Sequence, residues 1–296
     1  MSPLHRGMAL MLVFVAFWAG EEALLGQLHG KYHVVQVVWM RFAVHAAVVG
    51  AWLGWRRQAL AWSGSRPGLQ ALRALAMAAM PLCWVLGLRT GADMVSMLTV
   101  FWLSPLLVLL AGPWVFGQGV RLPVVAATGA GALGAWWLLG RDFPGVHEVL
   151  PPLGMGLAFA AYVLLTVALR GRPAAGNLFW LGAGVCVLFA PLLPSLWVAP
   201  GWRDLLVIAA VALTGLVGLG ALERVAAAGP LWPVWPMVFL QLPCGALLVL
   251  PHSMHHPNDL LLGSTVIALA AVVAWRLESR HAQVVPGLGP EPVTRW

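Results

Sequence analysis

The chain has 296 residues, of which 61% are hydrophobic and only 9% are charged, and its formal net charge is +7. Soluble domains carry roughly 25% charged residues, so this composition excludes an ordinary soluble globular protein. A nucleic-acid partner is not expected either, because the basic residues are scattered between apolar runs and do not form one basic stretch.

Apolar runs of about 20 residues, the length that crosses a bilayer core of about 30 Å, recur along the chain. The first run lacks a small-residue cleavage site and is followed at once by another, so we expect it to remain in the mature protein. The expected fold class is an all-α integral membrane protein with ten transmembrane helices. The expected spans are 7–28, 33–54, 69–88, 94–116, 121–140, 151–169, 176–198, 203–222, 230–250 and 259–277.

The basic residues are divided unequally between the two sides of these spans. If the N-terminus is cytoplasmic, the outer loops hold only Lys31, Arg89, Arg141 and Arg203. The inner loops and tails hold Arg6, Arg56, Arg57, Arg66, Arg73, Arg121, Arg170, Arg172, Arg224, Arg276, Arg280 and Arg295. This asymmetry predicts a multi-pass protein of the inner (cytoplasmic) membrane with both termini in the cytoplasm.

A polar, proline-rich stretch, "RDFPGVHEVLPP" at 141–152, divides the spans into two halves of five. Because five is odd, the two halves must insert with opposite orientation, which is the inverted-repeat architecture of many secondary transporters. The expected domains are a first five-helix repeat at 1–140, an outer linker loop at 141–150, a second repeat at 151–280 and a disordered cytoplasmic tail at 281–296.

Proline breaks the fourth span of each half at a similar place. Pro105 follows Trp102 in the first half, and Pro236 follows Trp232 and Trp235 in the second. A proline inside hydrocarbon frees a backbone carbonyl that must find another partner, so such breaks often line cavities. An ordinary kink within helix packing is the alternative.

Two motifs suggest chemistry that their context does not support. Residues 129–134 read "GAGALG" but lie inside an apolar span, where close helix packing is the better interpretation than dinucleotide binding. "HSMHH" contains His252, His255 and His256, whose spacing matches no common zinc site. Neither a cofactor nor a metal is expected, and the absence of GxSxG and HExxH motifs argues against an enzyme.

Ionisable residues inside a span are costly and each suggests a function. Glu21 and Glu22 lie in the first span, and Arg41 and His45 lie in the second. At about 1.5 Å per residue, Glu21 lies about 21 Å from the inner side and Arg41 about 12 Å from the outer side, so the two are nearly level. Because adjacent helical residues point about 100° apart, only one glutamate can face Arg41 squarely. The other is protonated, partnered by His45 or free to meet a cation.

Two interpretations of this charged cluster remain open. It is either a structural pair near the outer face or a site of substrate or proton coupling. Trp18, one turn from Glu22, favours contact with an organic cation, although 17 tryptophans make chance proximity common. The predicted coupling residues are Glu21, Glu22, Arg41 and His45, and the predicted cavity-lining residues are Trp18, Trp102, Pro105, Trp232, Trp235 and Pro236.

Nearly the whole chain resembles the ten-helix drug/metabolite transporters with two EamA domains. The resemblance rests on "FWAGEEALLGQLHGKYHVVQVVWMRF" (17–42), "SRPGLQALRAL" (65–75), "SPLLVLLAG" (104–112) and the glycine-rich fifth span, in that order. Glu22 followed by Tyr32, Gln36 and Arg41 is similar to members that take up S-adenosylmethionine. The chain departs from the family at "FGQGV", where Gln118 replaces an acid, and at Gly26, which replaces a lysine.

The resemblance implies a secondary active transporter that moves a small cationic or zwitterionic metabolite by alternating access. Its expected partners are a small-molecule substrate, membrane lipid and a coupled proton or other ion. The alternatives are a structural or assembly subunit without transport activity and, less favoured, a membrane-embedded enzyme.

Overall fold

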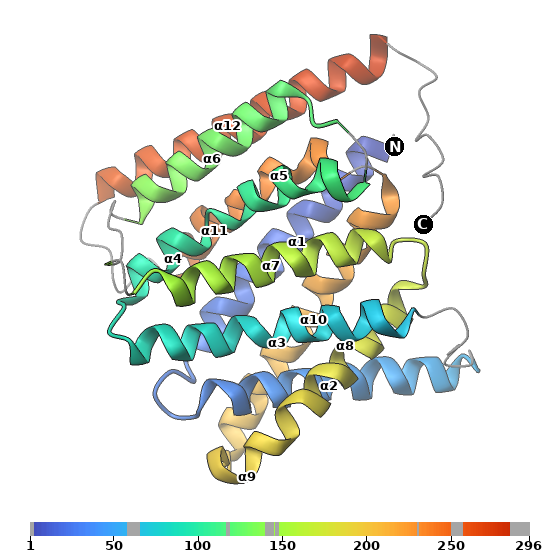
Figure 1. The fold of residues 1–296 in the computed structure, drawn as a ribbon, viewed down its shortest axis with the longest axis vertical. Helices are drawn as coiled ribbons and strands as arrows, with labels where there is room; N and C mark the ends of the chain where they lie inside the picture. The colour runs from blue at the N-terminus through green and yellow to red at the C-terminus, as the bar shows by residue number, and fades with distance from the viewer. Residues whose placement is uncertain are drawn as a thin grey trace.

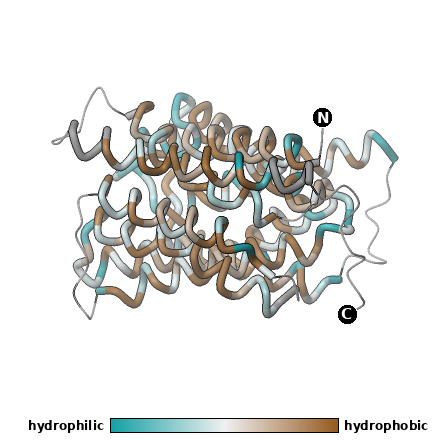
Figure 2. Tube along the Cα trace, turned by 90° about the horizontal axis from the view of Figure 1, so that it is seen from above, coloured by the Kyte–Doolittle hydropathy of each residue, from teal (hydrophilic) through white to brown (hydrophobic). Residues whose placement is uncertain are grey.

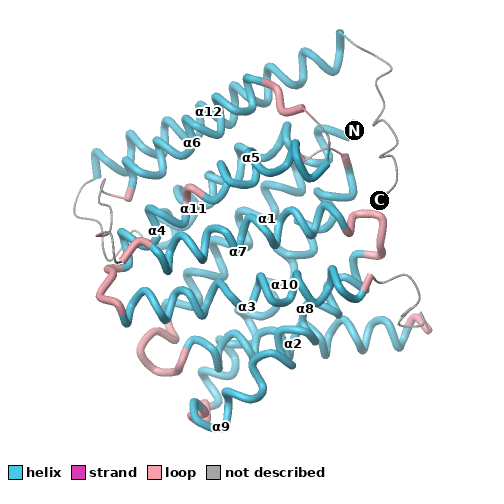
Figure 3. Tube along the Cα trace, viewed as in Figure 1, coloured by secondary structure: helices cyan, strands magenta, loops and turns pink. Residues whose placement is uncertain are grey.

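The structure, a computed structural model, describes residues 3–57, 66–116, 119–139, 145, 148–229, 231–249 and 257–284. Within these residues the regular structure is entirely helical (Figure 3). Eight of the helical segments described are long and apolar enough to cross a membrane, and two more, Leu122–Leu138 and Trp232–Leu248, are apolar but shorter. The chain is therefore a helical membrane protein, as its composition predicts.

The first half contains six helices, because its fourth expected span is divided. The break falls at Trp102 and Leu103, directly before Pro105, which takes the second position of a new helix, where its missing N–H costs little. Asp93 begins the divided span by accepting hydrogen bonds from the N–H groups of Val95 and Ser96. The helices are α1 (Pro3–Gly26), α2 (Val34–Trp55), α3 (Pro67–Arg89), α4 (Met94–Phe101), α5 (Ser104–Phe116) and α6 (Leu122–Leu138).

The second half differs from expectation mainly at helix ends. α10 continues six residues beyond the expected end at 222, and α12 continues to Val284, four residues into the expected tail. The segment around Pro236 is an unusually long 3₁₀ helix, η2. The elements are α7 (Leu150–Ala168), α8 (Ala174–Phe189), η1 (Ala190–Leu192), α9 (Leu193–Leu196), α10 (Trp202–Ala228), η2 (Trp232–Leu240), α11 (Gln241–Val249) and α12 (Pro257–Val284).

The long helices run across the view of Figure 1 between two faces of the molecule. The loop face carries the α1–α2 connection at 27–33 and the α3–α4 connection at 90–93. The terminal face is the opposite one, where α1 begins and α12 ends (Figure 1). Hydrophobic residues cover most of the trace between these faces (Figure 2), as helices surrounded by lipid require.

The core lies between helices of different halves. α1 packs on α10, α3 on α7 and α8, α2 on α8 and α10, and α6 on α12. Glycines permit the closest approach: a Cβ added at Gly263 of α12 would lie 2.8 Å from the carbonyl oxygen of Gly134 in α6. The "GAGALG" stretch is thus a surface for close helix packing, as its apolar context predicts.

Candidate functional site

Glu21 of α1 forms the predicted ion pair with Arg41 of α2. Glu21 is 5% exposed, and the Arg41 guanidinium also lies 5.0 Å from the ring centroid of Phe42. The pair packs directly against the backbone of Gly215 in α10, where an added Cβ would lie 2.7 Å from Glu21 Oε2 and 2.9 Å from Arg41 Nε. The ion pair is therefore enclosed by three helices, two from the first half and one from the second.

Glu22 has a different partner from its neighbour. It accepts a hydrogen bond from the Nε2 of Gln241, a buried residue at the start of α11 in the second half. Among the residues that the structure describes, no salt bridge joins Glu22 to a basic side chain. The Trp18 side chain also donates a hydrogen bond to Glu22. Glu22 is thus a carboxyl group bonded by an amide and an indole, while Arg41 pairs with Glu21.

The position of Glu22 on α1 shows which side of the helix it occupies. At about 100° per residue, Glu22 lies within about 20° of the direction of Met11, which is fully buried, and about 180° from Val13, which is exposed. Glu22 is nevertheless exposed. Because it lies on the buried side of α1, its exposed surface faces the other helices and not the lipid. It lies four residues, about 6 Å, from the end of α1 at the loop face.

His45 does not join the glutamates, contrary to one of the expectations from the sequence. Its Nε2 lies 2.7 Å from the carbonyl oxygen of Ala212 in α10. A carbonyl can only accept, so Nε2 donates this hydrogen bond. His45 is 1% exposed and its ring lies 4.9 Å from that of Phe42, so it is a buried packing residue one helical turn from Arg41.

The predicted aromatic residues come together around the proline break of the first half. Trp18 stacks on Trp102 with ring centroids 5.6 Å apart and packs on Phe159 at 5.4 Å. Trp235 donates a hydrogen bond from Nε1 to the carbonyl oxygen of Pro105, at 2.9 Å. This hydrogen bond joins η2, the proline break of the second half, to the beginning of α5, the proline break of the first half.

Most of these residues form packed core in this conformation and do not line an open space. Trp102 is 3% exposed, Trp235 is fully buried, and Pro105 and Pro236 are buried. Trp232 packs against Gly112 of α5, where any Cβ would collide with its ring. Trp18 alone of the six is half-buried, and it lies one turn below Glu22.

A second buried ionic cluster lies near the terminal face, and our sequence analysis did not predict it. Arg73 donates to Glu223 Oε1 at 2.5 Å and to the carbonyl oxygen of Asn177 at 2.8 Å. The amide of Asn177 donates to Glu223 Oε2 at 2.9 Å and accepts from Gln70 Nε2 at 2.7 Å. Each of these four residues is at most 5% exposed.

This cluster corrects the count of basic residues in the inner loops. The sequence predicts Arg73 as an inner-loop residue, but it is fully buried within α3 and does not count as a loop charge. Glu223 was missed because it lies one residue beyond the expected end of its span. Arg73 lies inside the expected span 69–88, and this position could have predicted that its charge is buried.

Tyr32 and Gln36, two residues of the family resemblance, form hydrogen bonds with the second half at the loop face. Tyr32 donates a hydrogen bond to Asp204 Oδ2 at 2.7 Å, and this bond raises the pKa of Tyr32 above its usual range. Gln36 donates to the carbonyl oxygen of Val198 at 2.6 Å and accepts from its N–H at 2.9 Å. Both residues thus attach the beginning of α2 to the second half and do not contact the Glu21–Arg41 pair.

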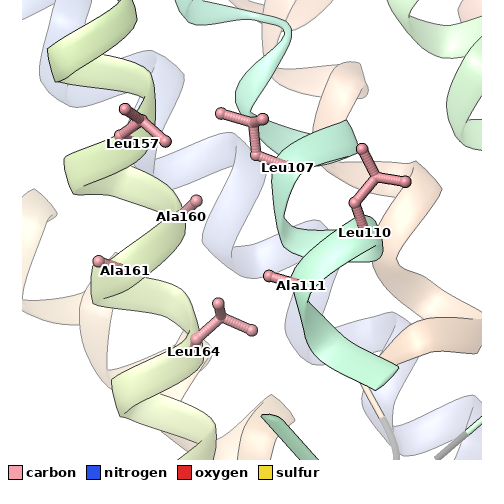
Figure 4. Close-up of a pocket in the computed structure, with 7 residues that line it drawn as sticks. All are labelled: Leu107, Leu110, Ala111, Leu157, Ala160, Ala161 and Leu164. Carbon is pink, nitrogen blue, oxygen red and sulfur yellow. The ribbon is translucent and has the colours of Figure 1, made fainter. Parts of the chain in front are cut away.

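A groove of about 430 Å³ lies between α5 and α7 (Figure 4). Its lining is four leucines and three alanines: Leu107, Leu110, Ala111, Leu157, Ala160, Ala161 and Leu164. It offers no polar side chain that could fix a charged ligand. In the described part of the chain no three His, Cys, Asp or Glu side chains are grouped to hold a metal ion. The "HSMHH" histidines and Gln118 lie outside the described residues.

Comparison with known proteins bears on the fold. No family model and no curated protein matches the sequence. The structure matches 28 solved chains, one of which is a crystal structure with a TM-score of 0.80 that covers 93% of this chain and 98% of that chain. Its sequence is 16% identical, so the likeness shows that the fold is shared and nothing about activity.

Proposed function

We propose that this protein is a secondary transporter that moves a small, positively charged or zwitterionic metabolite across the cytoplasmic membrane by alternating access. The observation that carries the proposal is Glu22, an exposed carboxyl group on the buried side of α1 that accepts hydrogen bonds from the Gln241 amide of the other half and from Trp18, and pairs with no described basic side chain. A carboxyl group inside a membrane span is costly, so each such group suggests a function.

Charge counting points to the class of substrate. Glu21 and Glu22 carry two negative charges when ionised, and Arg41 supplies one positive charge, which Glu21 already pairs. The negative charge of Glu22, one turn from Trp18, therefore lacks a basic partner. A cation or a proton would neutralise it. A carboxylate without a basic partner attracts a cation and repels an anion, which favours a substrate with a cationic group over a simple anion.

The packing of the helices supports the proposed ten-span inverted repeat. Exchanging α1 with α7, α2 with α8, α3 with α10, α4–α5 with η2–α11 and α6 with α12 turns most of the main packing pairs into observed pairs, and it returns α2–α8 and α6–α12 to themselves. The contact of α1 with α10 becomes that of α7 with α3, and the contact of α3 with α8 becomes that of α10 with α2. Repeats of this kind place the substrate path at their interface, where Glu22 meets Gln241.

The family and the topology are part of the same proposal. A ten-helix drug/metabolite transporter fits the order of the sequence motifs and the shared end of α1 and α12 at the terminal face (Figure 1). With the remaining loop arginines on the inner side, that face is the cytoplasmic one. A purely structural role suits the Glu21–Arg41 pair, but it gives no reason for an exposed Glu22.

Transport by the purified protein in liposomes tests the proposal. We expect uptake of labelled organic cations or zwitterions, and little uptake of anions of similar size, because only a positive group can complete the site. If protons are coupled, imposing a proton gradient will change the initial rate, whereas an equal gradient of an inert salt will not. Absence of flux for every class of small metabolite, with and without the gradient, would refute the proposal.

A further inference from the structure

The two ends of α10 are attached to the first half by ion pairs of very different character. At the loop face, Asp204 pairs with Lys31 at 3.0 Å, and the two side chains are 22% and 53% exposed. At the terminal face, Glu223 pairs with Arg73 at 2.5 Å, and these side chains are 2% and 0% exposed. Exposed pairs contribute little, whereas breaking a buried pair by removing one partner is strongly destabilising.

The buried pair joins the two halves at the end remote from Glu22. Arg73 belongs to α3 of the first half, and Glu223 and Asn177 belong to α10 and α8 of the second. Glu223 lies eight residues, about 12 Å, beyond Gly215, the α10 residue that touches the Glu21–Arg41 pair. One straight helix thus runs from the charged site to this second cluster.

The cluster is more than a single salt bridge. Both carboxylate oxygens of Glu223 are bonded, one to Arg73 and the other to Asn177, and Gln70 bonds the amide of Asn177 from α3. Arg73 also lies over the ring of Tyr162 in α7, with its Cζ 5.6 Å from the ring centroid. Arg73, Glu223, Asn177, Gln70 and Tyr162 therefore join four helices near the terminal face, whereas Glu22 lies four residues from the end of α1 at the loop face.

We propose that Arg73, Glu223, Asn177 and Gln70 form a gate that closes the terminal face in this conformation. This inference rests on the proposed transport function, in which the two faces open in turn. When the gate opens, water enters between α3 and α10 and hydrates both charges. When it closes, the pair is buried again and the four helices are rejoined.

Thiol labelling at the terminal face tests the gate without substrate or flux. The reporter is Thr166→Cys, a near-isosteric change at a buried position one turn from Tyr162 on α7, in a protein whose Cys83, Cys186 and Cys244 are replaced by alanine. A membrane-impermeant thiol reagent is added from the terminal face in inside-out vesicles. We expect slow labelling in the otherwise unchanged reporter protein and labelling about tenfold faster with Glu223→Gln, because a closed state held by the pair gives way to a populated open state.

Two further variants separate a gate from a loosened fold. Asp204→Asn removes a carboxylate from the other end of the same helix and should leave the labelling rate unchanged. The exchanged pair, Arg73→Glu with Glu223→Arg, should return labelling toward the slow rate. Slow labelling in Glu223→Gln would overturn the gate, and so would fast labelling that persists in the exchanged pair. Failure of flux in the wild-type protein would instead overturn the transport function and leave the labelling result standing.

Discussion

At the scale of single residues, two neighbouring glutamates of α1 have separate surroundings. Glu21 points to Arg41 and is buried, while Glu22 points to Gln241 and is exposed. The angle of about 100° between consecutive helical residues predicts that they diverge, but not which one takes the arginine. Gln241 could not be predicted as a partner, because 219 residues separate it from Glu22 and neither side chain alone specifies the other.

Gly215 holds the ion pair in place through its lack of a side chain. In Gly215→Ala the new methyl group would meet both Glu21 and Arg41, so we expect the pair to be displaced and the protein destabilised by about 1–3 kcal/mol. Thermal unfolding in detergent measures the change. Gly218→Ala is the matched control, because its added Cβ would meet only ordinary contacts at 3.6 Å or more. Equal unfolding midpoints for the two variants would contradict this close packing.

At the scale of elements, the paired proline breaks were predictable and the ends of α10 and α12 were not. Pro105 and Pro236 lie at the divided span and at η2, and their matching places in the two halves indicate the breaks. A single proline does not, because Pro81 and Pro113 lie inside the continuous helices α3 and α5. The end of α10 was set six residues too early because Glu223 and Arg224 look like the start of a polar loop. Only the tertiary partners Arg73 and Asn177 make it possible to bury Glu223 inside the helix.

The bond from Trp235 to the carbonyl oxygen of Pro105 joins the two breaks. Trp235→Phe keeps most of the ring but removes this hydrogen bond, so we expect a loss of about 0.5–1.5 kcal/mol and a lower unfolding midpoint. Trp114→Phe is the control, because Trp114 is 91% exposed and should tolerate the change. A midpoint for Trp235→Phe as high as that of the control would show that the bond contributes nothing.

At the scale of the whole molecule, charge is placed at three levels between the faces. Asp204 lies near the loop face, the Glu21–Arg41 pair lies deeper against Gly215, and Glu223 lies near the terminal face. All three charged sites include or contact a residue of α10. A tilt of this one helix would therefore change the contacts at all three sites together. The composition predicts a membrane protein. The spacing of these three charged sites along α10 depends on tertiary packing, which no local sequence pattern predicts.

The central claim is that Glu22 binds the transported cation or the coupled proton. The most direct measurement is initial flux per folded protein in liposomes for the wild type, Glu22→Gln and the control Glu148→Gln, which removes a carboxylate from a turn outside the charged cluster. We predict that Glu22→Gln lowers flux about tenfold or more, equivalent to about 1.4 kcal/mol, without a matching loss of folded yield, and that the control transports normally. Glu21→Gln and Arg41→Ala should also lose more flux than yield. Wild-type flux from Glu22→Gln would contradict the account.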